Sequence, residues 1–357
     1  MAAFHPLTVT GVRRETLESV VLTLAPPPAA RDAFRFVQGQ YLTLRTTLDG
    51  EEVRRSYSIC AAAHEPELRV GIKKIQGGLF STWANEEVVP GQVIEAMPPL
   101  GNFHLPLDPA THRYYVGFAA GSGITPLISI LKTTLAAEPH SRFTLVYGNR
   151  VTSSIMFRED LEDLKNENLG RLALVHILSR EQQDIELFNG RIDKAKCGQL
   201  LDHWLDIAGV DAAFICGPQD MMLQVSESLR EHGLDQRRIK FELFATAEPG
   251  KRARKAAAES VSRTETCQAT ITIDGRSREL EIAKQGPTVL DAALEAGMEL
   301  PFACKAGVCS TCRAMLTEGK VDMDANYALE DYEIVHGYIL TCQSYPTSDR
   351  LVVDFDQ

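Results

Sequence analysis

The sequence predicts three consecutive domains: an antiparallel six-stranded β-barrel, an α/β domain with a doubly wound parallel sheet, and a small α+β domain. The chain has 357 residues, which is more than one hydrophobic core usually organises. Its first part reads as short antiparallel strands, its middle part alternates strands with helices, and its last part carries four cysteines at a fixed spacing. We expect the boundaries at residues 1–106, 107–246 and 266–357, with residues 247–265 as a linker.

The first domain is predicted from six short segments in which apolar and polar residues alternate. Glycine and proline separate them, for example at Gly39, Gly50 and Pro90-Gly91. Short strands with few helices between them are typical of a small Greek-key barrel. The expected strands are Leu7–Val12, Val20–Leu24, Tyr41–Leu48, Val53–Cys60, Leu68–Lys74 and Val93–Ala96.

The second domain is predicted from a change of rhythm near Arg113, where apolar strands begin to alternate with helical segments. This alternation is typical of a parallel, doubly wound sheet. The expected strands are Tyr115–Ala119, Phe143–Tyr147, Leu172–Leu178, Ala212–Cys216 and Ile239–Phe244. The expected helices include Thr125–Ala136, Phe157–Lys165 and Pro218–His232, the last of which Gly233 closes.

The linker and the third domain follow. Periodicity is lost after Ala247, and the basic residues and alanines there fit either a flexible linker or a short solvated helix. Asp274-Gly275 is a hairpin dipeptide between two strands, and a helix is expected over Val289–Ala296. From residue 266 onward there are 15 acidic and 7 basic residues, a net charge of −8 out of −11 for the whole chain. Such a surface serves either docking onto a basic protein or solubility alone.

Four cysteines carry the strongest chemical signal. Cys304, Cys309 and Cys312 read C-x4-C-x2-C, and Cys342 follows at a distance. This is the spacing of plant-type [2Fe–2S] sites, in which each thiolate is bonded to iron and the cluster carries one electron. A structural zinc ion is the alternative, but zinc sites usually pair two C-x2-C knuckles. Gly307 within the loop allows the tight turn that aims backbone N–H groups at sulfur.

Bulk properties exclude other classes of function. The net charge of −11 argues against a nucleic-acid partner. The uncharged run Tyr114–Leu131 is interrupted by glycines and a proline, so a strand, loop and helix fit it better than a membrane span. No secretion signal opens the sequence, and the remaining cysteines show no disulfide-framework spacing. A reducing, cytoplasmic setting is therefore expected. Those cysteines are Cys60, Cys197, Cys216 and Cys267.

A first nucleotide site is predicted in the barrel. Arg55-Ser56-Tyr57-Ser58 ends the fourth strand, and Gly77-Gly78 with Ser81 opens a helix. Backbone N–H groups at a glycine-rich helix start bind a pyrophosphate, and an arginine on a neighbouring strand completes such a clamp. Tyr57 is expected to pack on a flat ring system and Ser58 to donate to the edge of that ring. The alternative is an ordinary barrel strand followed by a turn.

A second nucleotide site is predicted in the α/β domain. Gly121 and Gly123, with Thr125-Pro126, lie between its first strand and first helix, where a pyrophosphate approaches the helix N-terminus. The third glycine of the full dinucleotide fingerprint is missing. Cys216-Gly217-Pro218 lies where the fourth strand meets its helix, so Cys216 is expected to line the nicotinamide. A buried cysteine is otherwise an ordinary core residue.

The identity of the nicotinamide cofactor is predicted from the next two strand ends. An NAD site places an acid after the second strand to hold the ribose 2′-hydroxyl. Here Asn149-Arg150 follows the second strand and Ser179-Arg180 follows the third. Two arginines suit a 2′-phosphate, which favours NADPH, unless they are only surface residues.

With these motifs together, the chain resembles the ferredoxin–NADP reductase superfamily along its whole length. The resemblance implies a barrel that binds FAD, an NADP-binding domain, and a C-terminal β-grasp [2Fe–2S] ferredoxin. It implies that Arg55 holds the FAD pyrophosphate, that Tyr57 packs on the isoalloxazine, and that Ser58 lies near its N5. It assigns Lys73, Gly78 and Ser81 to the phosphate side and Phe244 to the other face of the ring. The position of Glu242 and Phe244 on the fifth strand by itself fits either residues that reach the flavin or a surface acid beside a core aromatic. Gln38 stands where relatives commonly carry proline.

The resemblance also implies a direction of electron flow, from NADPH through FAD to the cluster and on to an oxygenase partner. Four segments resemble reductases that serve a di-iron epoxidase acting on a CoA thioester. A Rieske or aromatic-ring hydroxylating oxygenase is the alternative partner. A passive one-electron carrier is the alternative of another class, and the intact flavin and nicotinamide motifs speak against it. The four segments are Tyr147–Arg150, Phe214–Pro218, Cys304–Cys312 and Val352–Asp356.

Overall fold

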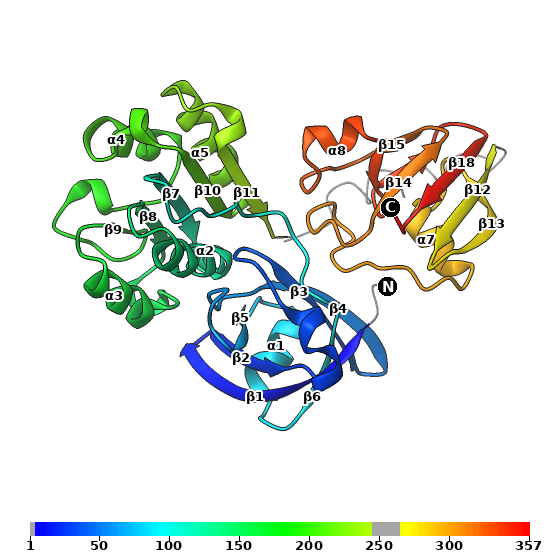
Figure 1. Cartoon of the computed structure of the whole chain (residues 1–357), viewed down its shortest axis with the longest axis horizontal. Coiled ribbons are helices and arrows are strands. Elements are labelled where there is room, and N and C mark those ends of the chain that lie inside the picture. The colour runs from blue at the N-terminus through cyan, green and yellow to red at the C-terminus, as the bar shows by residue number, and fades with distance from the viewer. Residues whose placement is uncertain (1–3, 245–264) are drawn as a thin grey trace. The chain divides into compact units, whose positions relative to one another are not determined.

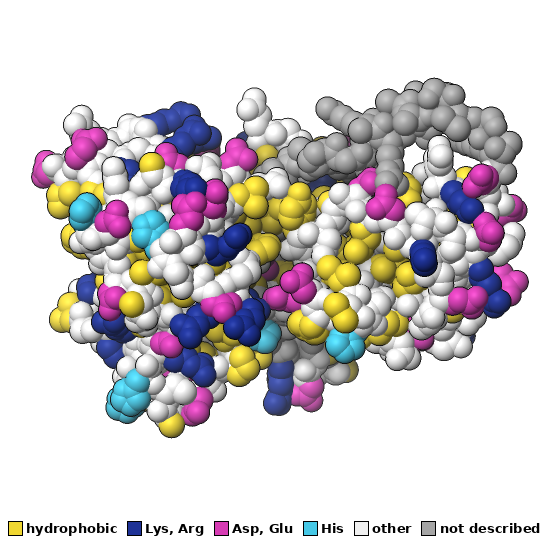
Figure 2. All heavy atoms as spheres, turned by 90° about the horizontal axis from the view of Figure 1, so that it is seen from above, with side chains coloured by type: hydrophobic (Ala, Val, Ile, Leu, Met, Phe, Trp, Pro, Cys, Tyr) yellow, Lys and Arg dark blue, Asp and Glu magenta, His cyan; other side chains and the backbone are white. Residues whose placement is uncertain are grey.

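The computed structural model describes residues 4–244 and 265–357. The chain divides into two compact units, one ending at Phe244 and one formed by the C-terminal part from Ala245 onward (Figure 1). Apart from Glu265, the linker predicted over residues 247–265 lies outside the described residues. Charged side chains of both signs are interspersed over the surface (Figure 2). No helix of the described ranges is long and apolar enough to cross a membrane.

The first half of the N-terminal unit is the predicted antiparallel six-stranded sheet, in the order β4-β3-β6-β1-β2-β5. A bridge between Ile59, just after β4, and Val70 of β5 joins the two ends of this order and closes the barrel. Helix α1 (Leu79–Glu86) follows β5. The strands are β1 (His5–Thr16), β2 (Ser19–Ala25), β3 (Tyr41–Leu48), β4 (Glu51–Ser58), β5 (Leu68–Lys73) and β6 (Val93–Ala96).

The second half is a parallel five-stranded sheet in the order β11-β10-β7-β8-β9. The chain winds from β7 to β8 and β9 and then returns to the other side of β7, so the topological switch point lies between β7 and β10. The strands are β7 (Tyr114–Ala120), β8 (Arg142–Asn149), β9 (Leu172–Leu178), β10 (Ala212–Gly217) and β11 (Ile239–Leu243). The helices are α2 (Ile124–Ala137), α3 (Arg158–Glu167), α4 (Lys194–His203) and α5 (Gln219–Glu231).

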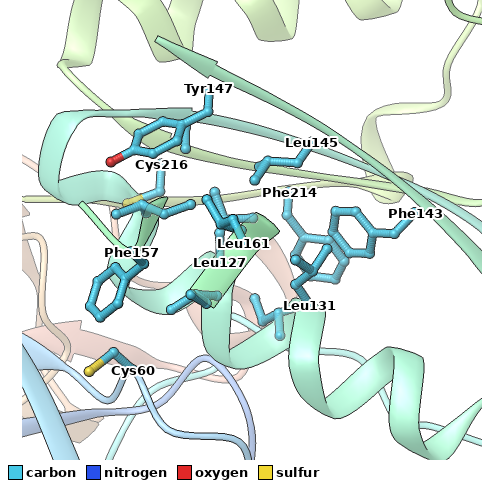
Figure 3. Packing of buried hydrophobic residues seen from close by; sticks show 14 of the residues in the cluster. Cys60, Leu127, Leu131, Phe143, Leu145, Tyr147, Phe157, Leu161, Phe214 and Cys216 are labelled. Atoms are coloured by element: carbon cyan, nitrogen blue, oxygen red, sulfur yellow. The ribbon is translucent and has the colours of Figure 1, made fainter. Parts of the chain in front are cut away.

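The barrel and the α/β sheet share one hydrophobic core. Val21 and Cys60 of the barrel belong to the same buried cluster as Leu127 of α2 and Phe157 (Figure 3). Ser129 of α2 donates to the carbonyl of Ala61 at 2.6 Å. Since dispersion and apolar burial act across this contact, the two domains hold each other in a fixed relative position.

Ion pairs reinforce the same contact. Arg13 and Lys132 both bind the Asp160 carboxylate, at 3.2 and 2.8 Å. The Glu15 carboxylate accepts from the backbone N–H of Phe157 at 2.7 Å. Burial raises the pKa of Glu15 above its ordinary value. These bonds pin the start of α3 to strand β1.

The C-terminal unit has a five-stranded sheet in the order β13-β12-β18-β14-β16, with β12 and β18 parallel, as in a β-grasp fold. Asp274 and Gly275 have φ of 52° and 68°, the left-handed values of the predicted hairpin turn. The strands are β12 (Thr266–Ile273), β13 (Arg276–Ala283), β14 (Arg313–Glu318), β16 (Tyr338–Leu340) and β18 (Arg350–Asp354), with a separate pair of β15 (Val321–Met323) and β17 (Ser344–Pro346). The helices are α7 (Val289–Glu295) and α8 (Asp331–Val335).

Candidate redox site

The glycines predicted for the second nucleotide site lie at the switch point. Gly121 has φ of 53°, and Gly123 comes so close to the next strand that a Cβ on it would lie 2.1 Å from the carbonyl oxygen of Cys216. Helix α2 begins there without a capping side chain. Its first N–H groups and partial positive charge therefore face the crevice at the carboxyl ends of β7 and β10.

A residue of the barrel motif lies at the same crevice. Ser58 ends β4 and is buried, and its hydroxyl donates to the Glu242 carboxylate of β11 at 2.9 Å. Glu242 is paired in register with Cys216 of β10, which is fully buried. Three side chains from two domains thus meet at one point. Phe244 follows β11 and packs, partly buried, against the shared core.

This trio has unusual ionisation. Burial raises the pKa of Glu242 to about 7, and the hydrogen bond from Ser58 offsets only part of that rise. Burial and the nearby Glu242 carboxyl together raise the pKa of Cys216 well above its ordinary value. Cys216 is therefore a neutral thiol at physiological pH, whereas Glu242 exchanges its proton there.

The glycine-rich loop before α1 has the conformation that its sequence predicts. Gly77 has φ of 74°, and Gly78 occupies the N-cap of α1, where no side chain caps the helix. The Ser81 hydroxyl accepts from the N–H of Ile75 at 3.1 Å and donates to Gly78, so it shapes the loop. Arg55 is exposed on β4. The Arg55 guanidinium donates to the carbonyl of Arg54 at 2.7 Å.

Tyr57 lies within an aromatic group that the sequence did not reveal. Its ring lies 5.4 Å from that of Phe80, whose ring lies 5.3 Å from that of Trp83. Burial raises the pKa of Tyr57, so its phenol stays protonated. The ring is held in place by α1 and offers a rigid face for stacking.

Positive charge gathers between the two nucleotide motifs. The ammonium of Lys73, at the end of β5, lies 3.7 Å from the position that a Cβ on Gly121 would take. Burial lowers the pKa of Lys73; the negative charge of Glu18 opposes this effect, and the positive charge of Arg150 adds to it. Lysine and arginine side chains beside a glycine turn suit a bound anion.

The predicted 2′-phosphate residues lie together at the edge of the sheet. The N–H of Arg180 donates to the carbonyl of Arg150 at 2.8 Å, and the N–H of Ser179 donates to that of Asn149 at 3.0 Å. Both arginines are exposed. The amide nitrogen of Asn149 is buried and has no hydrogen-bond partner among the described residues, which suits a ligand with an acceptor atom.

The four predicted cluster ligands converge in the C-terminal unit. The four cysteines are free thiols; those of Cys309 and Cys342 are hydrogen-bonded to the sulfur of Cys304, and Cys312 is hydrogen-bonded to Cys342. These bonds, with backbone N–H groups of Ala306 and Val308, lower the pKa of Cys304. In the described ranges no three His, Cys, Asp or Glu side chains are arranged so that they could hold a metal ion. The four thiolates would be the groups that hold an iron–sulfur cluster here.

The cysteine loop has a strained and well-anchored backbone. Lys305, Gly307 and Ser310 have φ of 51°, 74° and 47°, and a Cβ on Gly307 would lie 2.7 Å from the carbonyl oxygen of Ala325. Gln343 ties the loop to the fourth ligand, since its amide donates to the carbonyl of Lys305 at 2.9 Å. Within this loop the N–H of Ala306 donates to the sulfur of Cys304 at 3.3 Å, and such N–H groups suit a negatively charged iron–sulfur cluster.

Three family models match the chain, in an order that agrees with these sites. An oxidoreductase FAD-binding domain matches residues 16–105 and an oxidoreductase NAD-binding domain matches residues 118–227. A 2Fe-2S iron–sulfur cluster binding domain matches residues 271–347. The predicted cofactor-binding domains are confirmed.

Similarity to characterised proteins extends along the whole chain. The chain is 43% identical to one of the subunits of 1,2-phenylacetyl-CoA epoxidase from Escherichia coli K12, over 100% of this chain and 99% of that protein. It is 32% identical to the ferredoxin reductase component of 3-ketosteroid-9-alpha-monooxygenase from Rhodococcus rhodochrous, over 98% and 96% of the two chains.

Solved structures share the fold. Phthalate dioxygenase reductase matches with a TM-score of 0.59 and 22% identity, over 99% of this chain and 98% of that chain. An intact type IV self-sufficient cytochrome P450 monooxygenase matches with a TM-score of 0.71 and 21% identity, over 98% of this chain and 41% of that chain. The predicted three-domain architecture is confirmed.

Proposed function

Because the chain belongs to the family of oxygenase reductases that combine FAD-binding, NAD-binding and 2Fe-2S domains, we propose that it passes electrons from NADPH to the oxygenase component of a phenylacetyl-CoA 1,2-epoxidase, a di-iron enzyme of phenylacetate degradation. The observation that carries this proposal is the identity of 43% along the full length of one of the subunits of that enzyme. The other relatives named above serve other oxygenases, so the choice of partner rests on this match.

The flavin accepts electrons in pairs and releases them one at a time, and the [2Fe–2S] cluster carries single electrons. In this proposal Arg55 and the start of α1 at Gly77-Gly78 hold the FAD pyrophosphate. Tyr57 supports the ring, and Ser58 donates to the ring edge. Cys304, Cys309, Cys312 and Cys342 hold the cluster.

The nicotinamide side is assembled at the switch point. Gly121, Gly123 and the Thr125-Pro126 helix start take the dinucleotide pyrophosphate, with Lys73 beside them. Gly217 and Pro218 shape the crevice in which the neutral thiol of Cys216 lines the nicotinamide. The backbone N–H of Arg180 donates to the backbone carbonyl of Arg150, so the two arginines stay at neighbouring strand ends. Ser179 and Asn149 add polar groups. Paired guanidinium groups favour the 2′-phosphate of NADPH.

Ser58 and Glu242 give the first step a pH dependence. Above a pH of about 7 the ionised Glu242 carboxylate holds the Ser58 proton, and below it the protonated carboxyl donates to Ser58, which frees the Ser58 proton for the ring edge. We expect the rate of flavin reduction by NADPH in rapid mixing to rise as the pH falls through about 7. In Glu242→Gln this inflection is absent.

Glu15→Gln is the matched control for this prediction. Glu15 also has a raised pKa, but it lies at β1 and binds the backbone of Phe157. Its variant should keep the inflection. An unchanged profile in Glu242→Gln would show that Glu242 does not set the pH dependence.

The proposed function is tested by turnover with defined components. The purified reductase is mixed with the oxygenase component of a phenylacetyl-CoA epoxidase, phenylacetyl-CoA, and either NADPH or NADH. We expect epoxide formation, with a higher kcat/KM for NADPH. Epoxidation that is no faster than without the reductase contradicts the proposed partner, and turnover with a Rieske oxygenase instead would assign the alternative partner. Equal or better use of NADH contradicts the coenzyme preference.

A further inference from the structure

The C-terminal unit has an exposed apolar surface that the cofactor sites do not use. On helix α8, Val335 is 83% exposed, Tyr332 61% and Ile334 40%. We call these three side chains the α8 face. Among the described residues of this unit, the only other exposed large hydrophobic side chain is Tyr327, which precedes the same helix. Apolar surface concentrated on one short element marks an interaction site more often than scattered apolar residues do.

The α8 face is attached directly to the loop that carries the cluster ligands. Arg313 follows Cys312, and its guanidinium donates to the Glu333 carboxylate at 2.5 Å. Glu333 belongs to α8 and is 1% exposed, so the carboxylate end of this ion pair is buried, whereas the Arg313 side chain is 37% exposed. Before the helix, the N–H of Tyr327 donates to the carbonyl of Gly307 at 2.9 Å. A partner that sits on α8 is therefore positioned against the ligand loop.

The rim of the α8 face is negatively charged. Asp331 is exposed at the start of the helix, and Glu330, half-buried, is the N-cap residue that precedes it. Figure 2 shows acidic and hydrophobic side chains side by side on the face of this unit that it presents. An apolar centre with an acidic rim complements an apolar surface rimmed by lysine and arginine.

We propose that the α8 face is the surface on which the oxygenase component docks to receive each electron. This inference rests on the proposed function, because it takes the partner to be a separate protein. The flavoprotein unit is joined to this unit by the chain itself, and covalent connection raises its local concentration without any interface. A free oxygenase lacks that connection and must draw its affinity from buried surface and charge. The α8 face therefore serves the oxygenase component, which is not covalently connected to this chain.

The test compares Val335→Lys with Leu17→Lys in the full-length protein. Leu17 is 93% exposed in the N-terminal unit, so both variants place an ammonium group on a surface position. Each reduced protein is mixed rapidly with the oxidised oxygenase component of phenylacetyl-CoA epoxidase and, separately, with cytochrome c as a basic redox-protein probe. We expect Val335→Lys to lower both second-order rate constants at least about tenfold, because it removes apolar contact and repels a basic surface, and Leu17→Lys to leave them within about a factor of two. Reduction of the cluster by NADPH within the chain stays unchanged in both.

Each outcome decides a different point. If the wild type reduces cytochrome c but not the epoxidase, the proposed function fails. The rates with cytochrome c then decide by themselves whether the α8 face is a docking surface. If Val335→Lys slows cluster reduction within the chain and leaves the acceptor rates unchanged, α8 docks on the flavoprotein unit and the inference is wrong. Equal rates for all proteins overturn it as well. An unaltered visible circular dichroism spectrum of the cluster shows that the variant is intact.

Discussion

A Cys309→Ser variant is expected to reduce a dye such as ferricyanide with NADPH at a rate within about a factor of two of the wild type, yet to lose at least about 99% of the epoxidation supported by the oxygenase component. The reason is the separation of the two cofactor sites into different units. Cys309 is buried among the four converging thiols, and its removal leaves the cluster with three ligands. The flavin and nicotinamide residues lie in residues 4–244 and are untouched. Dye reduction and epoxide formation are measured on the same preparation.

Cys267→Ser is the matched control for this variant. Cys267 is a fully buried cysteine of β12 in the same unit, and its thiol donates to the carbonyl of Gln268 rather than to another cysteine. A serine there keeps a donor in place, so both activities should remain. Loss of epoxidation in Cys267→Ser as well would show that any disturbance of this core stops electron delivery. Full epoxidation by Cys309→Ser would contradict the assignment of Cys309 as a ligand.

Gly123→Ala is expected to have the second large effect. A Cβ on Gly123 would lie 2.1 Å from the carbonyl oxygen and 2.5 Å from the carbonyl carbon of Cys216, and both atoms are backbone. Backbone atoms of a strand cannot move aside as the end of a flexible side chain can, so β7 and β10 must separate. We expect a loss of about 2–4 kcal/mol in the stability of the N-terminal unit and a fall of at least about a hundredfold in NADPH-dependent flavin reduction. Thermal unfolding and rapid mixing measure the two.

Gly170→Ala is the control for Gly123→Ala. No atom lies within 4 Å of the position that a Cβ on Gly170 would take, so the added methyl meets only solvent. Its stability and flavin reduction should match the wild type. If Gly123→Ala behaves like Gly170→Ala, the close approach of the β7–α2 turn to β10 is not what shapes the nucleotide crevice.

Much of this architecture follows from local sequence. The six barrel strands and the five parallel strands were predicted because apolar alternation and glycine or proline breaks are local signals. The same is true of the Gly121–Gly123 turn, which follows an apolar strand and precedes a helix. Strand β1 runs to Thr16, beyond the predicted Val12, because its polar end pairs with β2. Helix α4 was not predicted, although Asp193, whose side chain accepts from the N–H of Lys196, is a recognisable N-cap.

The contacts between domains were not predictable in the same way. Ser58 and Glu242 are 184 positions apart and meet only because the barrel packs on the α/β sheet. The approach of Lys73 to Gly121 has the same origin: a strand of one domain ends at a turn of the other. Helix α8 (Asp331–Val335) and its exposed side were also not predicted. Tertiary packing decides all three, and no local pattern encodes it.

Rapid mixing of the wild-type protein with NADPH, followed at flavin and cluster wavelengths, tests the central claim most directly. Electrons enter the N-terminal unit in pairs and leave the C-terminal unit singly, so flavin absorbance should fall first and cluster absorbance should fall after it. Both absorbance changes should go to completion without the oxygenase component. A flavin that bleaches while the cluster stays oxidised would contradict the relay.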